Sequence, residues 1–215
     1  KMRANASFMV YNDENVIPAM VRSGIDPQDA VTYTMHGCNW PDIPGTQRTL
    51  NTMFVNLPDT LRGVLLEADG SIDAIDEVYD RFAAGIGKQI DEVCDGFRSA
   101  RAAWEENAPG ALRVDDCFLD GPVERARSWT LGGVKYPNVV CAPCGLASAA
   151  DGFAALDDLV FRIGTVSLNA LSDAVETDFE GQEPLRQRSL SAPKFGRDDD
   201  RADAHAVRVM QTVQR

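Results

Sequence analysis

The sequence predicts a mixed α/β fold in which helices predominate and short strands lie between them. The first observation is the run from Ile72 to Trp104, where apolar residues recur every three or four positions, as on the buried face of a long amphipathic helix. The second is a series of shorter helical patterns with capping signals. The third is a pair of short extended segments, ALRVDDCFLD and KYPNVVCAP.

The elements before the long helix are predicted from local signals. SFMVY reads as a strand. A short capped helix is expected from Asn12 to Gly24, and a second begins with Asp26 as N-cap and Pro27 at its first position. The stretch YTMHGCNWPDIPG, residues 33–45, is punctuated by glycine and proline and is expected to be a loop. Residues 47–66 are expected to be helical, with a break or kink at Pro58.

The long helix is expected to end at the Asn107, Pro109 and Gly110 breakers. Two further helices are predicted after it, over DGFAALDDLVFRIG and SLNALSDAVETDF. The tail SAPKFGRDDDRADAHAVRVMQTV is expected to be a polar loop followed by a helix. The 215 residues are enough for one large domain or two small ones.

Composition excludes several classes of protein. The net charge is −12 and the pI is about 4.5, which argues against nucleic-acid binding because that function needs clustered Lys and Arg. No apolar run is long enough for a membrane span, and no signal-peptide pattern begins the chain. We therefore expect a cytoplasmic protein with no membrane or nucleic-acid partner.

The chain has five cysteines, an odd number widely spread, so reduced thiols are expected rather than a disulfide framework. Cys141 and Cys144 form a C-A-P-C motif, which could be half of a zinc site or a redox pair. A zinc site would need two more ligands, and no others stand at paired spacing; the remaining candidates are Cys94, Cys117, His36 and His205. Two buried thiols at a turn are the simpler interpretation, and no metal site is predicted.

Residues 33–45 hold a thiol and an imidazole together, Cys38 and His36. This pair could suggest a thiolate nucleophile activated by histidine. Two side chains at positions i and i+2 usually diverge, and no Asn or Asp that would orient the imidazole is identifiable. The residues alone leave the role of this segment open.

The flanking sequence resembles the glycyl radical enzymes, the family of pyruvate formate-lyase, glycerol and choline lyases, arylacetate decarboxylases and benzylsuccinate synthase. The resemblance runs through the whole chain, in family order. It is carried by YNDENVIPAMVRSGIDPQDAVTYTMHGC, PDIPG, TLGGVKYPN, CGLASAADGFAALDDLVF and DFEGQEPLRQRSLSAPKFGRDDDRADAHAVRV. Two departures are Pro137, inserted in the family's G-G-x-x-Y-N pattern, and Arg197, where the family usually has Asn.

The resemblance implies a ten-stranded barrel with external helices and a cysteine on a loop at its centre. A second loop, R-V-x-G-Y, carries the radical glycine in the family, and this chain has no such motif. Residues 1–215 are therefore interpreted as a fragment of one barrel domain that lacks the N-terminal half and the glycyl loop. Such a fragment is expected to be inactive by itself and marginally stable, because half a barrel leaves a sheet edge uncovered.

By the resemblance, Cys38 is the catalytic residue: its thiyl radical would abstract hydrogen from the substrate. Gly37, Asn39, Trp40 and His36 are expected to line the substrate pocket, with Asp42 and His36 as candidate acid–base groups. Many family lyases that eliminate water or an amine carry G-C-x-E, with the glutamate as general base, but here that position is Trp40. Pyruvate formate-lyase has a second cysteine where this chain has Asn39.

These two departures favour carbon–carbon bond cleavage or formation on an apolar or aryl substrate, similar to arylacetate decarboxylases or benzylsuccinate synthase. The alternatives are a C–O or C–N eliminating lyase of the same family, a non-catalytic relative, and a CxxC thiol or metal protein. The family also implies an enzyme of the lyase or formate acetyltransferase type and, at full length, a homodimer. No cofactor is expected to bind the fragment; the glycyl radical lies outside it and is installed by an activating enzyme with an iron–sulfur cluster and S-adenosylmethionine.

Overall fold

The computed structural model describes residues 11–36, 40–68, 71–107 and 111–214. In these ranges the chain is a mixture of helices and strands, which confirms the predicted α/β class. The strand expected over SFMVY lies almost entirely outside the described residues. None of the helices in the described ranges combines the length and the apolar character that crossing a bilayer requires.

The elements of the first half of the chain are two short helices, a hairpin, a long strand and two further helices. They are α1 (Asp13–Arg22), α2 (Pro27–Ala30), β1 (Thr34–His36), β2 (Trp40–Asp42), β3 (Gln47–Asn56), α3 (Leu57–Leu66) and α4 (Ile75–Asn107).

The second half contains two 3-10 helices, one strand, a π-helical turn and four α-helices. They are η1 (Val114–Phe118), η2 (Trp129–Leu131), β4 (Tyr136–Cys144), α5 (Leu146–Leu156), η3 (Asp157–Arg162), α6 (Leu168–Glu176), α7 (Glu183–Ser191) and α8 (Asp200–Val213).

The chain divides into two compact units. Unit 1 comprises residues 1–52 and 97–140, and unit 2 comprises residues 53–96 and 141–215. Each has its own apolar core: the core of unit 1 is built on Met20, Ile25, Ala30 and Ile43, and that of unit 2 is larger and built around Phe82 and Phe153. Strands β3 and β4 and helix α4 each contribute residues to both units.

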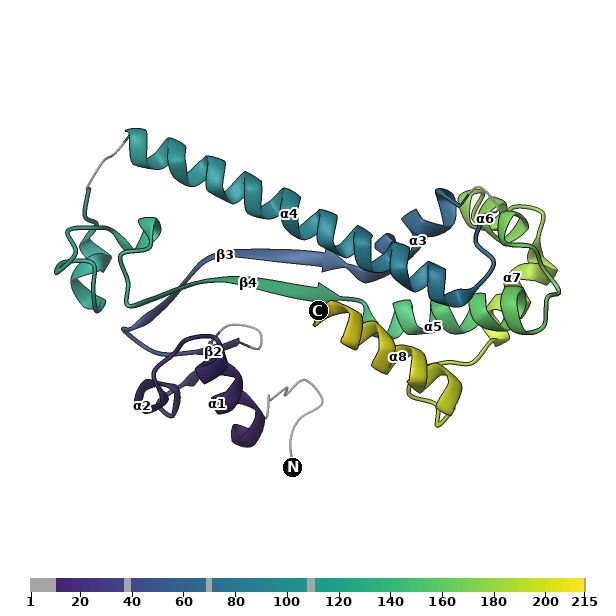
Figure 1. Ribbon diagram of the computed structural model, residues 1–215, viewed down its shortest axis with the longest axis horizontal. Helices are drawn as coiled ribbons and strands as arrows, with labels where there is room; N and C mark the ends of the chain where they lie inside the picture. The colour runs from purple at the N-terminus through teal and green to yellow at the C-terminus, as the bar shows by residue number, and fades with distance from the viewer. Residues whose placement is uncertain (1–10, 37–39, 69–70, 108–110, 215) are drawn as a thin grey trace, which may run out of the picture. The chain divides into compact units, whose positions relative to one another are not determined.

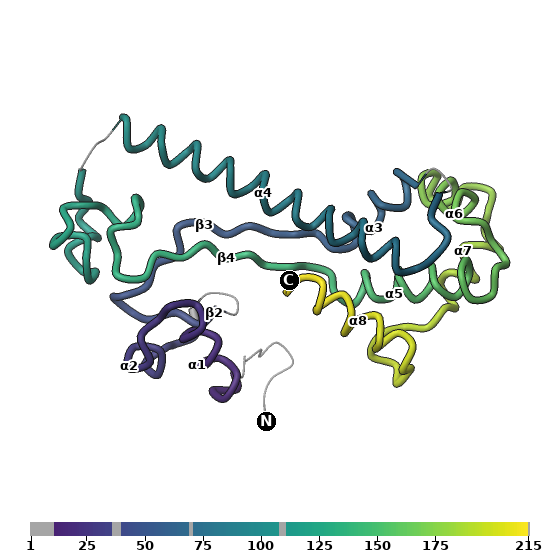
Figure 2. The backbone as a smooth tube through the Cα atoms, viewed as in Figure 1, coloured from purple at the N-terminus to yellow at the C-terminus, as the bar shows by residue number. Residues whose placement is uncertain are grey.

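The strands form two separate two-stranded sheets among the described residues. Strands β1 and β2 pair antiparallel. Strands β3 and β4 are hydrogen-bonded neighbours and run in the same direction (Figures 1 and 2). A parallel pair needs a long crossover between its strands, and here the crossover contains α3 and α4.

The prediction of helix over residues 47–66 is wrong for its first half, where strand β3 runs from Gln47 to Asn56. This segment contains threonines, a phenylalanine and a valine, residue types that favour a pleated backbone. Pro58 does not break a helix but stands in the first turn of α3, where its missing N–H costs nothing. The Asn56 side chain accepts a hydrogen bond from the Asp59 backbone N–H and caps that helix.

Two further predictions differ from the structure. ALRVDDCFLD was expected to be extended but contains the 3-10 helix η1. The fully buried Asp116 carboxylate accepts hydrogen bonds from the backbone N–H groups of Arg113 and Trp129, both at 2.7 Å, and these bonds compete with strand pairing. Residues 33–45, expected to be a loop, contain the β1–β2 hairpin.

Helix α7 was not predicted from the sequence, because it has no buried residue and therefore no apolar stripe. The long helix was predicted correctly, and α4 extends over residues 75–107. Its apolar stripe is buried only in its first turns, at Val78, Tyr79, Phe82 and Ile86, whereas Trp104 near its end is 59% exposed.

The core of unit 2 contains a polar cluster on one side. Phe153 of α5 stacks on Tyr79, with ring centroids 4.0 Å apart, and meets Phe82 edge to face. Helix α8 packs along α5 (Figure 2) and brings His205 to this cluster, where the Tyr79 hydroxyl and His205 Nδ1 are 2.9 Å apart. His205 Nε2 lies 3.7 Å from Asp157 Oδ2, and the Arg208 guanidinium covers the Tyr79 ring and pairs with Asp76.

We expect protonation of His205 to destabilise unit 2. Burial lowers the pKa of His205 below its ordinary 6.5, opposed by the Asp157 carboxylate. The unfolded chain therefore binds this proton at higher pH than the folded chain, so the free energy of unfolding falls as the pH drops through about 6.5, and this contribution is constant above about pH 7.5. Urea unfolding between about pH 8 and pH 5.5 should show a steeper loss for the wild type than for His205→Gln. Equal slopes would contradict this assignment.

Candidate functional site

The β1–β2 hairpin carries the segment that the sequence singled out. Its register pairs Thr34 with Asp42, Met35 with Pro41 and His36 with Trp40. Residues 37–39 join the two strands in the sequence, so the predicted catalytic Cys38, with Gly37 and Asn39, lies outside the described residues. Of His36 the structure describes the backbone pairing and not the side chain.

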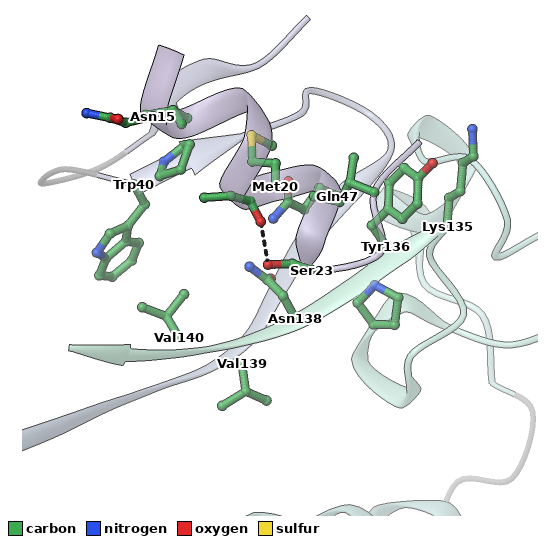
Figure 3. Close-up of a pocket in the computed structure, with 15 residues that line it drawn as sticks. Asn15, Met20, Ser23, Trp40, Gln47, Lys135, Tyr136, Asn138, Val139 and Val140 are labelled. Atoms are coloured by element: carbon green, nitrogen blue, oxygen red, sulfur yellow. Dashed lines mark hydrogen bonds between the residues drawn. The ribbon is translucent and has the colours of Figure 1, made fainter. Parts of the chain in front are cut away.

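Trp40 and Pro41 of β2 line a cavity of about 590 Å³ within unit 1 (Figure 3). Helix α1 and the first half of β4 form its other walls. Trp40 is thus a wall residue of this cavity, and its expected role in a substrate pocket stays a prediction.

The walls of this cavity are mainly apolar, with a small number of polar groups, a composition typical of small-molecule sites. The apolar part includes Val16, Ala19, Met20, Ile25, Val139 and Val140. The polar part includes Gln47, Lys135, Tyr136 and Asn138 (Figure 3).

Two of the polar groups are amide oxygens without a hydrogen-bond partner in the described part of the chain. They are Gln47 Oε1, on a residue that is 6% exposed, and Asn138 Oδ1. Both oxygens are covered almost completely by the protein, and buried acceptors are nearly always satisfied in folded proteins, so these two are exceptions.

The other polar group at the cavity is a hydrogen-bonded cluster around Asp29. The Asp29 Oδ2 atom lies 2.6 Å from Lys135 Nζ and 2.6 Å from the Tyr136 hydroxyl. The Lys135 hydrogen bond, followed by that from Tyr136, lowers the pKa of Asp29, and the same contact raises the pKa of Lys135. The Tyr136 hydroxyl also lies 3.2 Å from the Asp26 backbone N–H and can accept its hydrogen bond, so α2 is joined to the start of β4 at two points.

Two glycines, Gly132 and Gly133, precede β4, whose first residues line the cavity. Gly132 adopts φ +82 at the end of η2, a left-handed conformation that favours glycine. At Gly133 a Cβ atom would lie 1.7 Å from the Arg127 carbonyl oxygen, so any side chain would force the backbone apart. These contacts give a physical reason for the two glycines in TLGGVKYPN, the segment that also contributes Tyr136 and Asn138.

The carboxylate of Asp42, a predicted acid–base candidate, makes a hydrogen bond with the backbone of the next residue. Its Oδ1 atom accepts a hydrogen bond from the Ile43 backbone N–H at 3.0 Å. Asp42 is not among the described residues that line the 590 Å³ cavity. Its acid–base role stays a prediction.

The C-A-P-C motif lies in an extended strand, not at a helix start. Cys141 and Cys144 both belong to β4, so their Cα atoms are three residue steps of extended chain apart, about 10 Å. A disulfide requires a Cα separation below about 7 Å, so this strand would have to break to form one. Both thiols are exposed, which differs from the predicted burial. Throughout the described ranges, no three His, Cys, Asp or Glu residues gather where they could hold a metal ion.

Sequence reasoning did not single out Gln47, Lys135, Tyr136 or Asn138 as pocket residues. The last three stand in TLGGVKYPN, a segment whose resemblance to the family pattern was noted without a role. Gln47 carried no signal, because a single glutamine at the start of a strand looks like any surface residue.

A cavity with mainly apolar walls and a few polar groups is typical of a domain that binds a small molecule. The chain belongs to the glycyl radical enzymes: the Pyruvate formate lyase-like family model matches residues 2–215.

The curated relatives are much longer than this chain. It is 34% identical over 229 residues to the probable dehydratase YbiW of Escherichia coli, covering 94% of this chain and 27% of that protein. It is 42% identical over 219 residues to isethionate sulfite-lyase of Desulfovibrio desulfuricans, covering 91% and 26%. The chain thus spans about a quarter of the length of these relatives.

Solved structures share the fold. The glycerol-bound B12-independent glycerol dehydratase of Clostridium butyricum matches with a TM-score of 0.85 at 24% identity, over 94% of this chain and 27% of that one. A Roseburia inulinivorans structure described for 1,2-propanediol dehydration matches with a TM-score of 0.81 at 25% identity, over 94% and 28%.

We expect Gly133→Ala to destabilise unit 1, because the added methyl group meets the Arg127 carbonyl. A clash with fixed backbone should cost about 1–3 kcal/mol or more in the free energy of unfolding. Gly87→Ala is the matched control: Gly87 lies in α4 with nothing within 4 Å of an added Cβ, so the change should be neutral or stabilise by up to about 1 kcal/mol. Urea unfolding of the two variants beside wild type measures both, and equal stabilities would contradict the assignment.

Proposed function

We propose that the whole protein containing this chain is a glycyl radical lyase that breaks a carbon–heteroatom bond in a small substrate. The observation that carries this proposal is the set of curated relatives, which are named as a probable dehydratase and isethionate sulfite-lyases at 34–42% identity. Dehydratases break a C–O bond, and isethionate sulfite-lyase is named for the release of sulfite. The relatives therefore favour elimination, the alternative in the sequence-based prediction, over carbon–carbon chemistry.

The parallel β3–β4 pair supports a place for this chain in a larger barrel. Parallel strands are ordinarily covered on both faces, yet Phe54 in β3 is 66% exposed and Val139 in β4 is 40% exposed. We propose that these strands belong to the family's ten-stranded barrel. The other strands would come from sequence beyond this chain, in relatives about four times as long.

Cys38 is proposed as the catalytic residue. The glycyl radical, installed by an activating enzyme that uses S-adenosylmethionine and an iron–sulfur cluster, would supply the capacity to convert the Cys38 thiol to a thiyl radical. The S–H bond of Cys38 would break homolytically, and its hydrogen atom would pass to the glycyl radical. The thiyl sulfur would then take a hydrogen atom from a substrate carbon, forming a new S–H bond and a substrate radical. The heteroatom group would leave with the bonding electron pair and a proton, and the product radical would take the hydrogen atom back from the Cys38 thiol.

The chain's described residues would protect this radical chemistry. An indole cannot act as a general base. Its apolar ring can form part of the cavity wall, and we propose that Trp40 excludes water there. Elimination with Trp40 at the family's glutamate position requires another proton acceptor. Asp42 and His36 are the proposed candidates, and the whole enzyme is proposed to work as a cytoplasmic homodimer.

Carbon–carbon cleavage or formation is the second candidate. The observation that favours it is Trp40 itself, which places an aromatic wall where the eliminating lyases of the family carry a carboxylate. The two candidates differ in product, so a direct assay separates them.

Substitution of Cys38 tests the catalytic assignment. In the whole protein, activated without oxygen, Cys38→Ala should abolish turnover and leave the radical signal detectable by electron paramagnetic resonance, because the glycine radical forms without the thiol. Cys117→Ala is the control, since Cys117 is an exposed thiol of η1. Turnover by the Cys38→Ala variant would contradict the assignment of Cys38 as the catalytic residue.

A substrate panel tests the reaction class. The activated protein should turn over at least one of isethionate, 1,2-propanediol, glycerol and trans-4-hydroxy-L-proline, the compounds named in the relatives and solved structures. The expected products are sulfite from isethionate, an aldehyde or ketone from the diol and glycerol, and a cyclic imine from the hydroxyproline. Loss of carbon dioxide from an arylacetate, or addition of an aryl hydrocarbon to an alkene, with no turnover of these four compounds would transfer support to carbon–carbon chemistry.

A further inference from the structure

We infer that Tyr33 and Asp13 form a redox site, in which Tyr33 gives an electron to a protein radical while its phenolic proton passes to the Asp13 carboxylate. The site removes a thiyl radical that finds no substrate, which is an activity distinct from the lyase reaction. The inference rests on the proposed function in one respect, because it takes the thiyl radical of Cys38 as the oxidant.

The two residues make a short contact within unit 1. The Tyr33 hydroxyl donates a hydrogen bond to Asp13 Oδ1 at 2.5 Å. Asp13 is the first residue of α1, and Tyr33 immediately precedes β1, the first strand of the hairpin. In the part of the chain that the structure describes, no cation pairs with the Asp13 carboxylate, which is exposed and can exchange a proton with water. An ionised carboxylate has only acceptor sites, so Asp13 can receive the phenolic proton.

The hydrogen bond to Asp13 makes Tyr33 easier to oxidise. A phenol that loses an electron becomes a strong acid, so its proton must leave the oxygen as the electron leaves the ring. The bond to Asp13 gives that proton a direct path, and a charged acceptor makes such a bond strong. The same hydrogen bond raises the pKa of Tyr33, so the hydroxyl keeps its proton until oxidation occurs.

The redox step balances in electrons and protons. One electron passes from the Tyr33 ring to the thiyl sulfur of Cys38, which becomes a thiolate, and one proton passes from the Tyr33 oxygen to Asp13 Oδ1. The products beside each other are a neutral tyrosyl radical and a neutral carboxylic acid. The thiolate then takes a proton from water, and Asp13 returns its proton to water. Tyr33 stands five residues before Cys38 in the sequence, and five residues of extended chain span at most about 18 Å, so the electron can tunnel within the protein.

Tyr136 offers a direct comparison, because it also donates a hydrogen bond to a carboxylate. Its hydroxyl lies 2.6 Å from Asp29 Oδ2, and the Lys135 ammonium lies 2.6 Å from the same oxygen. The Lys135 hydrogen bond, followed by that of Tyr136, lowers the pKa of Asp29, which makes this carboxylate a weak proton acceptor. Asp13 has no such cation among the described residues, so oxidation favours Tyr33 over Tyr136.

The other two of the four tyrosines in this chain are less suited to the same role. The Tyr11 ring lies 6.1 Å from that of Tyr33, but its buried hydroxyl has no partner among the described residues, so its proton has no acceptor. Tyr79 has an acceptor in His205 Nδ1 at 2.9 Å, but it belongs to unit 2, whereas the hairpin belongs to unit 1. The surroundings of the four side chains therefore single out Tyr33.

Electron paramagnetic resonance of the whole protein, activated without oxygen and held without substrate, tests the inference. We expect a tyrosyl radical signal that narrows when the protein contains ring-deuterated tyrosine. Tyr33→Phe should lower this signal at least about tenfold, and Asp13→Asn should do the same because the charged proton acceptor is lost. Asp13→Glu keeps a carboxylate and should retain most of the signal.

Tyr136→Phe is the matched control, since it removes the other tyrosine that is hydrogen-bonded to a carboxylate, and it should leave the tyrosyl signal in place. Three results would overturn the inference: no tyrosyl signal in wild-type protein that carries the glycyl radical, a signal that persists in Tyr33→Phe, or an equal loss in Tyr136→Phe. An undiminished signal in Asp13→Asn would overturn the role of Asp13. The exposed position of Asp13 makes this variant expected to fold.

The redox site and the proposed lyase function fail separately. If Cys38→Ala abolishes turnover and the wild type forms no tyrosyl radical, the lyase chemistry holds and the redox site is wrong. If the tyrosyl signal requires Tyr33 but persists in Cys38→Ala, the redox site holds and Cys38 is wrong as its oxidant.

Discussion

The pairing of β3 with β4 is the constraint on which the other features depend. Two parallel strands bury too little surface to be stable alone, so helices must cover them and long crossovers must join them. Helix α3 begins at the residue after β3 and α5 begins two residues after β4, and α3 packs against α5. At Gly145, between β4 and α5, a Cβ would lie 2.6 Å from Pro58 of α3, so the close approach of these helices itself requires glycine. The same two strands supply Gln47 and Asn138, which links the framework to the cavity.

Sequence periodicity predicted helices that bury one face. It missed strand β3, which is fixed by pairing with another strand, and the 3-10 helix η1, which is fixed by side-chain hydrogen bonds. Helix α4 was correct because Val78, Tyr79, Phe82 and Ile86 recur at helical spacing. Strand β3 was taken for helix because ten mixed residues preceded a true helix, and only the pairing with β4 decides between the two states. The 3-10 turn at Asp116 depends on a hydrogen bond to the Trp129 backbone N–H, thirteen residues away, which no local pattern records.

Only some residues of the candidate site could be predicted from the sequence. The family pattern predicted roles for Cys38, Gly37 and Trp40 from their order along the chain, and for Cys38 and Gly37, which lie outside the described residues, these roles stay predictions. The partners across the cavity could not be read in this way: Gln47 and Asn138 come together only because β3 and β4 are neighbours, and their significance is an absence of hydrogen bonds among the residues that the structure describes. Asp29 and Lys135 are 106 residues apart, so their neutralisation of each other, and with it the charge of the cavity, is a property of the folded chain.

Trp40 lines the cavity at the position where many lyases of the family carry a glutamate. A glutamate at that position would place a carboxylate in a cavity whose lining includes Met20 and Ile25, and an apolar lining disfavours charge unless a polar partner compensates. Tryptophan removes both the charge and the base. The described lining of the cavity also includes the side-chain amides of Gln47 and Asn138, which are neutral and cannot take a proton. Under the proposed elimination, the proton acceptor is therefore a residue other than Trp40, and Asp42 and His36 are the proposed candidates.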